Sequence, residues 1–497
     1  MHGGFVDADG ECWYHIDGIG GLDGQAPFFV ALASDSDLWA FVSTAGSLAA
    51  GRRDADGSFF PYETVDKIHR RWQHTGPRSW IRLVDGAQAE LWQPFAAPLA
   101  GGSSGARSVA KNLSGTRLRL REEHPSGRIA FEVEWSTAAD LGLVRSARLV
   151  ALRGPVAVQV LDGLLNLVPP GLSVQQVNQF SSLTDAYKWN ESAAGGRAGL
   201  YTLYAKIWDR AEPKESFEAL VAWHAGPPAL ASGVKTLLSA HQVEAFCRSG
   251  LVEAEALTRG RPGAFLVNFD AVVDADGLPW HQVIDGPRSQ VQAFELCRWL
   301  ESGGGTPVEI AQALLRNTEG LDGLLARADG LQSSGDAMAA AHHRANVLFN
   351  IMRGGVFADG TRWDRDDLQA FVQQRNRPLA QQLQPLFATW PQQVERAWAL
   401  QAAGAAAGPQ AERLLLAYLP LTFSRRHGDP SRPWNKFSVR VRDAQGRRVV
   451  NYEGNWRDIF QNWEALLASE PVYAGSMIEA FLGAMTPDGH NPYRIGR

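Results

Sequence analysis

The N-terminal part of the chain alternates apolar and polar residues in the way that half-buried β-strands do. Residues 118–121 and 128–135 both alternate, and a Pro-Ser-Gly turn signal lies between them at 125–127, so they predict a β-hairpin. Alternating or β-branched runs recur at residues 146–152, 156–161, 217–223 and 264–273. Because these strands follow one another without intervening helices, residues 1–305 predict a large antiparallel β-sandwich.

A helical pattern replaces the strand pattern at residue 306. The glycines at 303–305 break the chain, Thr306 is a candidate N-cap, and Pro307 suits the first helical position. Glu309 completes a capping box, and apolar residues follow at helical spacing, so residues 306–336 predict a helical linker. Further helices are predicted over residues 337–353, 365–375, 378–402, 409–420, 456–468 and 475–485.

Residues 421–455 interrupt these helices with a long loop and a predicted hairpin. The hairpin strands are 437–441 and 448–450, and the turn between them is 443–446. The predicted fold class is therefore β + α multidomain, with a β-sandwich at 1–305, a linker at 306–336 and a helical domain at 337–497.

The helix predicted from residue 456 starts with an unusual mixture of aromatic and planar polar side chains. Its apolar residues form one stripe at helical spacing, namely Trp456, Ile459, Phe460 and Trp463. Its other face carries hydrogen-bonding groups, namely Arg457, Asp458, Gln461 and Asn462. Asn455 is a candidate N-cap, and a carboxylate at the third helical position suits the helix dipole. Sugar hydroxyls bind planar polar groups and sugar rings stack on indoles, so the segment predicts a sugar-binding wall. The alternative is that the tryptophans only fill a core.

Polar side chains also mark the helix predicted at 337–353. Arg344, Asn346, Asn350 and Arg353 lie within reach of a shared surface, and the two asparagines are four residues apart. This pattern predicts a ligand-facing edge. The alternative is a buried helix whose polar groups bond neighbouring loops.

Two loops carry further candidates. Residues 424–436 combine Arg425, Arg426 and His427 with prolines and a glycine that exclude a helix, so they predict a functional loop, the alternative being a solvated surface loop. Residues 486–494 form a turn-rich loop in which Asp488 and Asn491 are candidate ligand-binding side chains.

Composition narrows the function classes. The net charge of −5 among 497 residues gives no electrostatic reason to expect nucleic acid or an anionic membrane as partner. Three widely spaced cysteines predict neither a disulfide framework nor a metal site, and nucleotide-binding and Gly-x-Ser-x-Gly motifs are missing, so no cofactor is expected. The sequence lacks a signal peptide and an apolar run of transmembrane length, so a cytoplasmic protein is expected. Seventeen tryptophans are many for this length and favour carbohydrate handling.

These segments resemble the cellobiose phosphorylase family of inverting glycoside phosphorylases (glycoside hydrolase family ninety-four). The most specific likeness is residues 455–462, which are similar to the family's aromatic-Arg-Asp-x-x-Gln-Asp motif, with Asn462 in place of the final Asp. The family's Trp-Asn-Pro stretch has no clear copy here. Weaker likenesses lie at residues 3–11, 41–47, 80–85 and 91–94.

The resemblance implies a β supersandwich, a helical linker and the first part of an (α/α)6 barrel. It implies that Arg457 and Asp458 grip the sugar at the non-reducing end, and that Gln461 and Trp456 complete its pocket. It places the general acid beyond Arg497, so that the chain is expected to be the N-terminal part of a longer protein. The segment containing Arg425, Arg426 and His427 is expected to line a substrate or anion route.

The predicted activity is cleavage of a disaccharide or oligosaccharide, with inorganic phosphate as co-substrate and a homodimer as one arrangement. Two alternatives stay open. The first is a glycoside hydrolase on the same scaffold, in which water replaces phosphate. The second is a non-catalytic sugar-binding or assembly protein.

Overall fold

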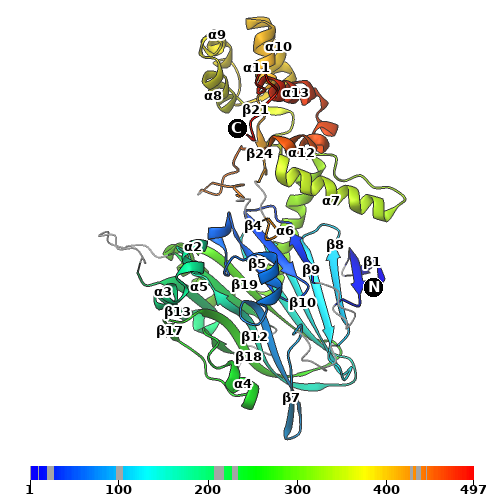
Figure 1. The fold of residues 1–497 in the computed structure, drawn as a ribbon, viewed down its shortest axis with the longest axis vertical. Helices are drawn as coiled ribbons and strands as arrows, with labels where there is room; N and C mark the ends of the chain where they lie inside the picture. The colour runs from blue at the N-terminus through cyan, green and yellow to red at the C-terminus, as the bar shows by residue number, and fades with distance from the viewer. Residues whose placement is uncertain are drawn as a thin grey trace. The chain divides into compact units, whose positions relative to one another are not determined.

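The chain forms two compact units, which are described separately below (Figure 1). The computed structural model describes residues 2–8, 10–19, 27–96, 105–205, 218–226, 233–425, 429–432, 438–443 and 445–497. Unit 1 contains the described residues up to 319 together with 429–432, and unit 2 contains 320–425 and those from 438 onward. The division falls inside helix α6 (Pro307–Ala326), whereas the finer bounds at 305 and 336 stay predictions.

Unit 1 is built on antiparallel sheets (Figure 1). Among the described residues, the largest sheet has eleven strands, in the order β1 (His2–Ala8), β2 (Glu11–Asp17), β8 (Arg107–Asn112), β9 (Arg117–Glu123), β10 (Ile129–Ala138), β11 (Gly142–Ala151), β19 (Leu278–Arg288), β15 (Ala219–Ala225), β14 (Ala198–Leu203), β13 (Lys188–Ala193) and β17 (Leu257–Arg259). A sheet of five described strands runs in the order β16 (Lys235–Leu237), β18 (Gly263–Val273), β12 (Val156–Leu167), β6 (Gly76–Asp85) and β7 (Gln88–Trp92). A smaller sheet consists of β3 (Phe29–Leu32), β4 (Leu38–Ser43) and β5 (Leu48–Arg52).

Short helices lie between these strands, so the prediction that the strands of residues 1–305 follow one another without intervening helices is wrong. Ser173 and Ser289 each begin a helix with a capping box, which is a local helix signal. The α-helices of unit 1 that precede α6 are α1 (Val65–Arg70), α2 (Val174–Gln179), α3 (Ser181–Ala186), α4 (Val243–Ser249) and α5 (Gln290–Glu301). The predicted capping box begins α6, because Glu309 accepts a hydrogen bond from the Thr306 amide at 2.9 Å and the Glu309 amide donates to Thr306 Oγ1 at 3.3 Å.

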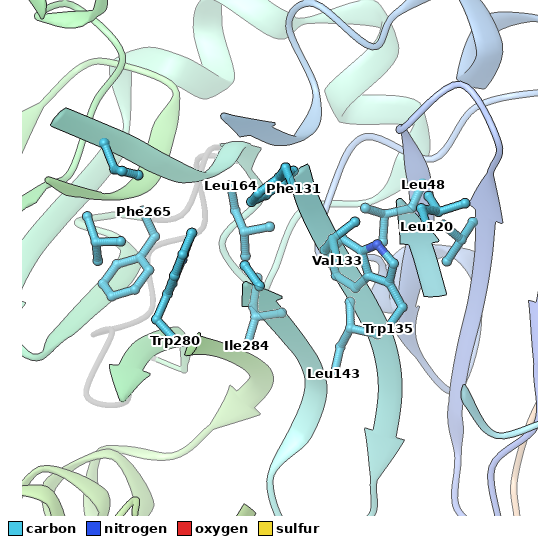
Figure 2. Packing of buried hydrophobic residues seen from close by; sticks show 14 of the residues in the cluster. Leu48, Leu120, Phe131, Val133, Trp135, Leu143, Leu164, Phe265, Trp280 and Ile284 are labelled. Atoms are coloured by element: carbon cyan, nitrogen blue, oxygen red, sulfur yellow. The ribbon is translucent and has the colours of Figure 1, made fainter. Parts of the chain in front are cut away.

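The strand predictions are confirmed where the structure describes them. The predicted hairpin is the pair β9 and β10, in which Leu118 lies opposite Trp135. Residues of both large sheets share one core, which contains Trp135 of β10, Leu164 of β12, Phe265 of β18 and Trp280 of β19 (Figure 2). In β9 only alternate residues are buried, and Leu118 and Leu120 lie in this core, which is why the alternating pattern identified that strand, whereas β10 is buried along nearly its whole length.

A buried ion pair joins the two large sheets. Both terminal nitrogens of the Arg145 guanidinium donate to Asp162, Nη1 to Oδ2 at 2.5 Å and Nη2 to Oδ1 at 2.8 Å. Trp280 Nε1 donates to Oδ2 of the same carboxylate at 2.7 Å and Ser79 Oγ to Oδ1 at 2.6 Å. Arg145 is 2% exposed and Asp162 is 0% exposed, so each charge depends on the other for its stabilisation.

The histidine on β15 is expected to make unit 1 less stable in acid. Burial lowers the pKa of His224 to about 4 from its ordinary 6.5, and the positive charge of Arg197 lowers it as well. The unfolded chain therefore binds a proton at this position below about pH 6.5, whereas the folded chain does so only near pH 4. Well above pH 6.5 the ring is neutral in both the folded and the unfolded chain, so this histidine adds no pH dependence there. At about pH 5 the proton bound by the unfolded chain is expected to lower the free energy of unfolding by about 2 kcal/mol.

Denaturant unfolding at several pH values tests this expectation. The stability of the wild type should fall between about pH 7 and about pH 5 more steeply than that of His224→Gln, in which no proton binds. Two parallel profiles would show that His224 is not responsible.

Unit 2 is mainly helical. Its described helices after α6 are α7 (Ala337–Gly354), α8 (Arg365–Arg375), α9 (Arg377–Phe387), α10 (Arg396–Ala407), α11 (Pro409–Leu416), α12 (Trp456–Ser469) and α13 (Ala474–Gly483). Its short described strands form the pairs β20 (Val356–Phe357) with β23 (Leu421–Thr422), β21 (Arg362–Asp364) with β22 (Gln393–Glu395), and β24 (Glu453–Asn455) with β25 (Arg494–Gly496). The β + α organisation is therefore as predicted, whereas the (α/α)6 barrel stays a prediction.

The prediction of one helix over 378–402 is wrong. The chain leaves α9 after Phe387 and re-enters a helix only at Arg396, with strand β22 between. Pro391 explains the break, because proline lacks the amide donor and disfavours a helical conformation at the residue before it. The partner of β22 is β21, about thirty residues earlier in the chain, and this long-range pairing has no local signal.

Two other boundaries differ from prediction. The helix predicted over 409–420 ends at Leu416, because the chain turns there toward β23. The predicted hairpin is reduced, in its described part, to a bridge between Arg442 and Arg448 with a hydrogen bond from the Val449 amide to the Val441 carbonyl at 3.1 Å.

Candidate functional site

The candidate site in unit 2 depends on a close approach between α7 and α12. Gly354 ends α7, and a Cβ atom there would lie 2.7 Å from the backbone oxygen of Asn462. Trp463 Nε1 donates to the Gly354 carbonyl at 3.0 Å. A side chain at residue 354 would push the two helices apart, so glycine is required at this position.

Most of the apolar stripe of α12 is buried, which is the alternative that the sequence left open. Ile459 and Trp463 are 0% exposed and Trp456 is 7% exposed. The ring of Trp456 packs against Phe481 of α13 with 5.4 Å between ring centres. These contacts hold α12 in place. They also put the Trp456 indole in the core of unit 2, which agrees with the alternative that the tryptophans fill a core.

Asn462 does not lie on the polar face where the sequence placed it. It is 4% exposed, and its Nδ2 donates to Asn350 Oδ1 at 3.1 Å. Asn350 in turn donates to Asn346 Oδ1 at 3.3 Å, and the Asn346 side chain is exposed. Asn462 is buried because α7 covers the flank of α12 that this side chain occupies. The structure thus brings Asn346 and Asn350 together with α12 in one amide network.

Arg457 and Asp458 form the exposed polar face at the start of α12. The Arg457 side chain is 80% exposed, that of Asp458 is 45% exposed, and Arg457 Nε lies 3.6 Å from Asp458 Oδ1. No other described residue bonds either side chain. Gln461 is also exposed and follows Arg457 by one helical turn. A rigid helix therefore presents a guanidinium, a carboxylate and an amide to solvent.

Arg425 is buried at the C-terminal end of α7. Its backbone amide donates to the Met352 carbonyl at 2.9 Å, and its guanidinium carbon lies 4.5 Å from the centre of the Phe423 ring. Ser424 links this segment to both neighbours, because its Oγ donates to the Arg353 carbonyl at 2.7 Å and accepts from the Glu453 amide at 3.3 Å. These bonds of Ser424 connect the segment that contains Arg425 to β24, which leads directly into α12. Arg426 and His427 lie outside the described residues.

The loop after α13 contributes backbone rather than the predicted side chains to this region. The Tyr493 carbonyl accepts from the Trp456 amide at 3.2 Å. Asp488 bonds within its own loop, where the Thr486 hydroxyl and His490 lower the pKa of its carboxyl group. Asn491 Nδ2 donates to the Phe481 carbonyl at 3.4 Å. Among the described residues, no hydrogen bond joins Asp488 or Asn491 to Arg457 or Asp458.

Two general properties concern the described residues alone. They contain no group of three or more His, Cys, Asp or Glu side chains arranged to hold a metal ion. None of their helices is both long and apolar enough to cross a lipid bilayer.

Comparisons with known proteins give only distant likenesses. No protein-family model and no curated protein sequence matches the chain. A bacterial glucoamylase complexed with acarbose is similar at 13% identity and a TM-score of 0.33, over 78% of this chain and 55% of that one. A GalM/aldose epimerase homologue from C. elegans is similar at 9% identity and a TM-score of 0.31, over 52% of this chain and 98% of that one. The chain spans about half the length of the glucoamylase that it matches.

Proposed function

We propose that the start of α12 binds a sugar residue, and that the chain is all or part of a carbohydrate-active enzyme that cleaves a glycosidic bond. The observation that carries this proposal is the exposed pair Arg457 and Asp458 on a helix whose Ile459 and Trp463 side chains are anchored in the core. The likeness of residues 455–462 to a sugar-gripping motif of glycoside phosphorylases supports it.

The chemistry of the pair suits neighbouring sugar hydroxyls. A guanidinium offers several N–H donors in one plane, and a carboxylate offers two acceptor oxygens. Hydrogen bonds to charged groups contribute about 1.5–3 kcal/mol each, roughly twice a neutral bond. Because α12 is held by buried aromatic residues, little backbone conformational entropy is lost when a sugar binds, and the ordering cost falls mainly on the exposed Arg457 side chain.

The favoured reaction is inverting phosphorolysis to a sugar 1-phosphate. In this reaction an acid protonates the leaving oxygen while inorganic phosphate attacks the anomeric carbon from the opposite face. Arg457 and Asp458 would orient the sugar, with Gln461 beside them, and the Arg425 segment would lie along the anion route. No described residue is assigned as the general acid.

Titration calorimetry with cellobiose and other β-linked disaccharides tests the binding step. Arg457→Ala and Asp458→Ala are each expected to weaken binding about tenfold or more, because each removes a charged hydrogen-bonding partner. Arg362→Ala is the matched control, since Arg362 belongs to another exposed pair, 62% exposed and 2.8 Å from Glu395. Unchanged affinity in both α12 variants would contradict the assignment.

Product analysis on the same samples separates the reaction types. A sugar 1-phosphate formed only with phosphate supports phosphorolysis. Reducing sugar released without phosphate would instead indicate a hydrolase. Binding without any product would indicate a non-catalytic sugar-binding protein.

A further inference from the structure

Unit 1 contains a polar pocket that the proposed function does not use. It has a volume of about 600 Å³ and lies between α6 and the face of the eleven-stranded sheet that points away from the core. The sheet contributes charged and polar side chains, and α6 contributes mainly aliphatic ones. A pocket of this size is in the range of small-molecule sites.

The strand register explains why the polar side chains meet. Glu134 of β10 lies opposite Arg119 of β9 on one side and opposite Ser146 of β11 on the other. Ser146 lies opposite His281 of β19. Directly opposed residues of antiparallel strands point to the same face, so these four side chains form one row across the pocket floor.

Ion pairs hold the row in place. Glu134 accepts from Arg117 Nε at 2.7 Å and from Arg119 Nη2 at 2.9 Å, although the carboxylate is only 7% exposed. Ser146 Oγ and His281 Nδ1 are 2.8 Å apart, and no described residue bonds Nε2 of this histidine. Burial lowers the pKa of His281, against an opposing effect of the Glu134 charge, so the ring is neutral at pH 7.

The carboxylates and guanidinium groups of the lining balance in charge, and the pocket has one polar wall and one apolar wall. Its carboxylates and guanidinium groups are equal in number, namely Glu11, Glu132 and Glu134 against Arg117, Arg119 and Arg148. The opposite wall includes Ile310, Leu314 and Leu315, and Leu315 is 57% exposed. An anion would meet the carboxylates and a cation the guanidinium groups, while a wholly apolar ligand would leave polar groups desolvated.

We infer that this pocket is a second carbohydrate site, which binds a neutral mono- or disaccharide. Vicinal hydroxyl groups pair with the planar carboxylate and guanidinium groups of the floor, and the free His281 nitrogen adds one more partner. The C–H face of the sugar ring lies against the leucines of α6. This site stands on the chemistry of unit 1 alone and does not depend on Arg457 or Asp458.

Saturation-transfer NMR with D-glucose and with cellobiose, on the whole chain, tests the inference. Leu315→Ala removes the apolar contact with the sugar ring and is expected to weaken binding at this site about fivefold or more. Val308→Ala is the matched control, because Val308 is 65% exposed on the same helix and does not line the pocket. His281→Gln is expected to weaken binding as well, with the thermal midpoint unchanged.

Comparison with Arg457→Ala separates this site from the one on α12. Saturation transfer that persists in Arg457→Ala and is reduced in Leu315→Ala supports the pocket. Transfer that is lost in Arg457→Ala and unaffected by Leu315→Ala overturns it and leaves the proposed function standing. Absence of transfer from both sugars at about 10 mM in the wild type also overturns it.

Discussion

Replacing Asp162 by alanine is expected to lower the free energy of unfolding of unit 1 by about 3–5 kcal/mol. The change leaves the Arg145 guanidinium, which is 2% exposed, without the carboxylate that now binds it at 2.5 and 2.8 Å. It also removes the acceptor of Trp280 Nε1 and of the Ser79 hydroxyl. Hydrogen exchange of the β11 and β12 amides, read by mass spectrometry, measures the loss in unit 1 specifically.

Two further variants make this test specific. Asp270→Ala removes an exposed carboxylate from the neighbouring strand β18 and is expected to change stability by no more than about 0.5 kcal/mol. The double variant Arg145→Met, Asp162→Leu replaces the ion pair by apolar groups and should recover much of the lost stability. Equal losses in the single and double variants would show that packing, rather than the unpaired charge, decides the effect.

The second large effect is expected for Trp463→Ala in unit 2. The Trp463 side chain is 0% exposed, packs edge-on against Tyr452 with 5.8 Å between ring centres, and bonds the Gly354 carbonyl. Removing it opens a cavity between α7 and α12 and leaves that carbonyl without its indole partner, at a cost of about 3–5 kcal/mol. Hydrogen exchange of the α7 and α12 amides is the measurement.

Trp398→Ala is the control for this variant. Trp398 also lies in unit 2, on α10, but it is 48% exposed. Its loss is expected to cost about 1 kcal/mol or less. If both variants destabilised unit 2 equally, the contact between α7 and α12 would not be the feature that anchors the candidate site.

Local patterns in the sequence located several strands of unit 1 and most of the described helices of unit 2. The alternation at 118–121 identified β9 because only alternate residues of that strand are buried, whereas 128–135 alternates although β10 is buried along nearly its whole length. The capping box at Thr306 and Glu309 marked the start of α6 because it satisfies free amides within four residues. The prediction of one long helix over 378–402 is wrong because it followed the helical spacing of the apolar residues and disregarded Pro391.

The candidate site was predictable in part. Spacing along α12 separated the stripe of Trp456 and Trp463 from Arg457 but left open whether the indoles contact a sugar or fill a core, and in the structure both indoles are buried while Arg457 is exposed. Spacing could not show that α7 packs beside Asn462 and turns its amide inward. The pocket under α6 carried no motif, because its floor comes from strands distant in sequence.

The sequence by itself determined several strands of unit 1, most of the described helices of unit 2, where α6 and α12 begin, and that Arg457, Asp458 and Gln461 share one polar face of α12. These properties depend on residues within a few positions of one another. The tertiary structure alone decided that Asp162 meets Arg145, that Asn462 is buried against Asn350, and that Glu134, Ser146 and His281 form one row. Burial and pairing of this kind depend on which strands and helices become neighbours, and those contacts join residues from about ten to more than a hundred positions apart.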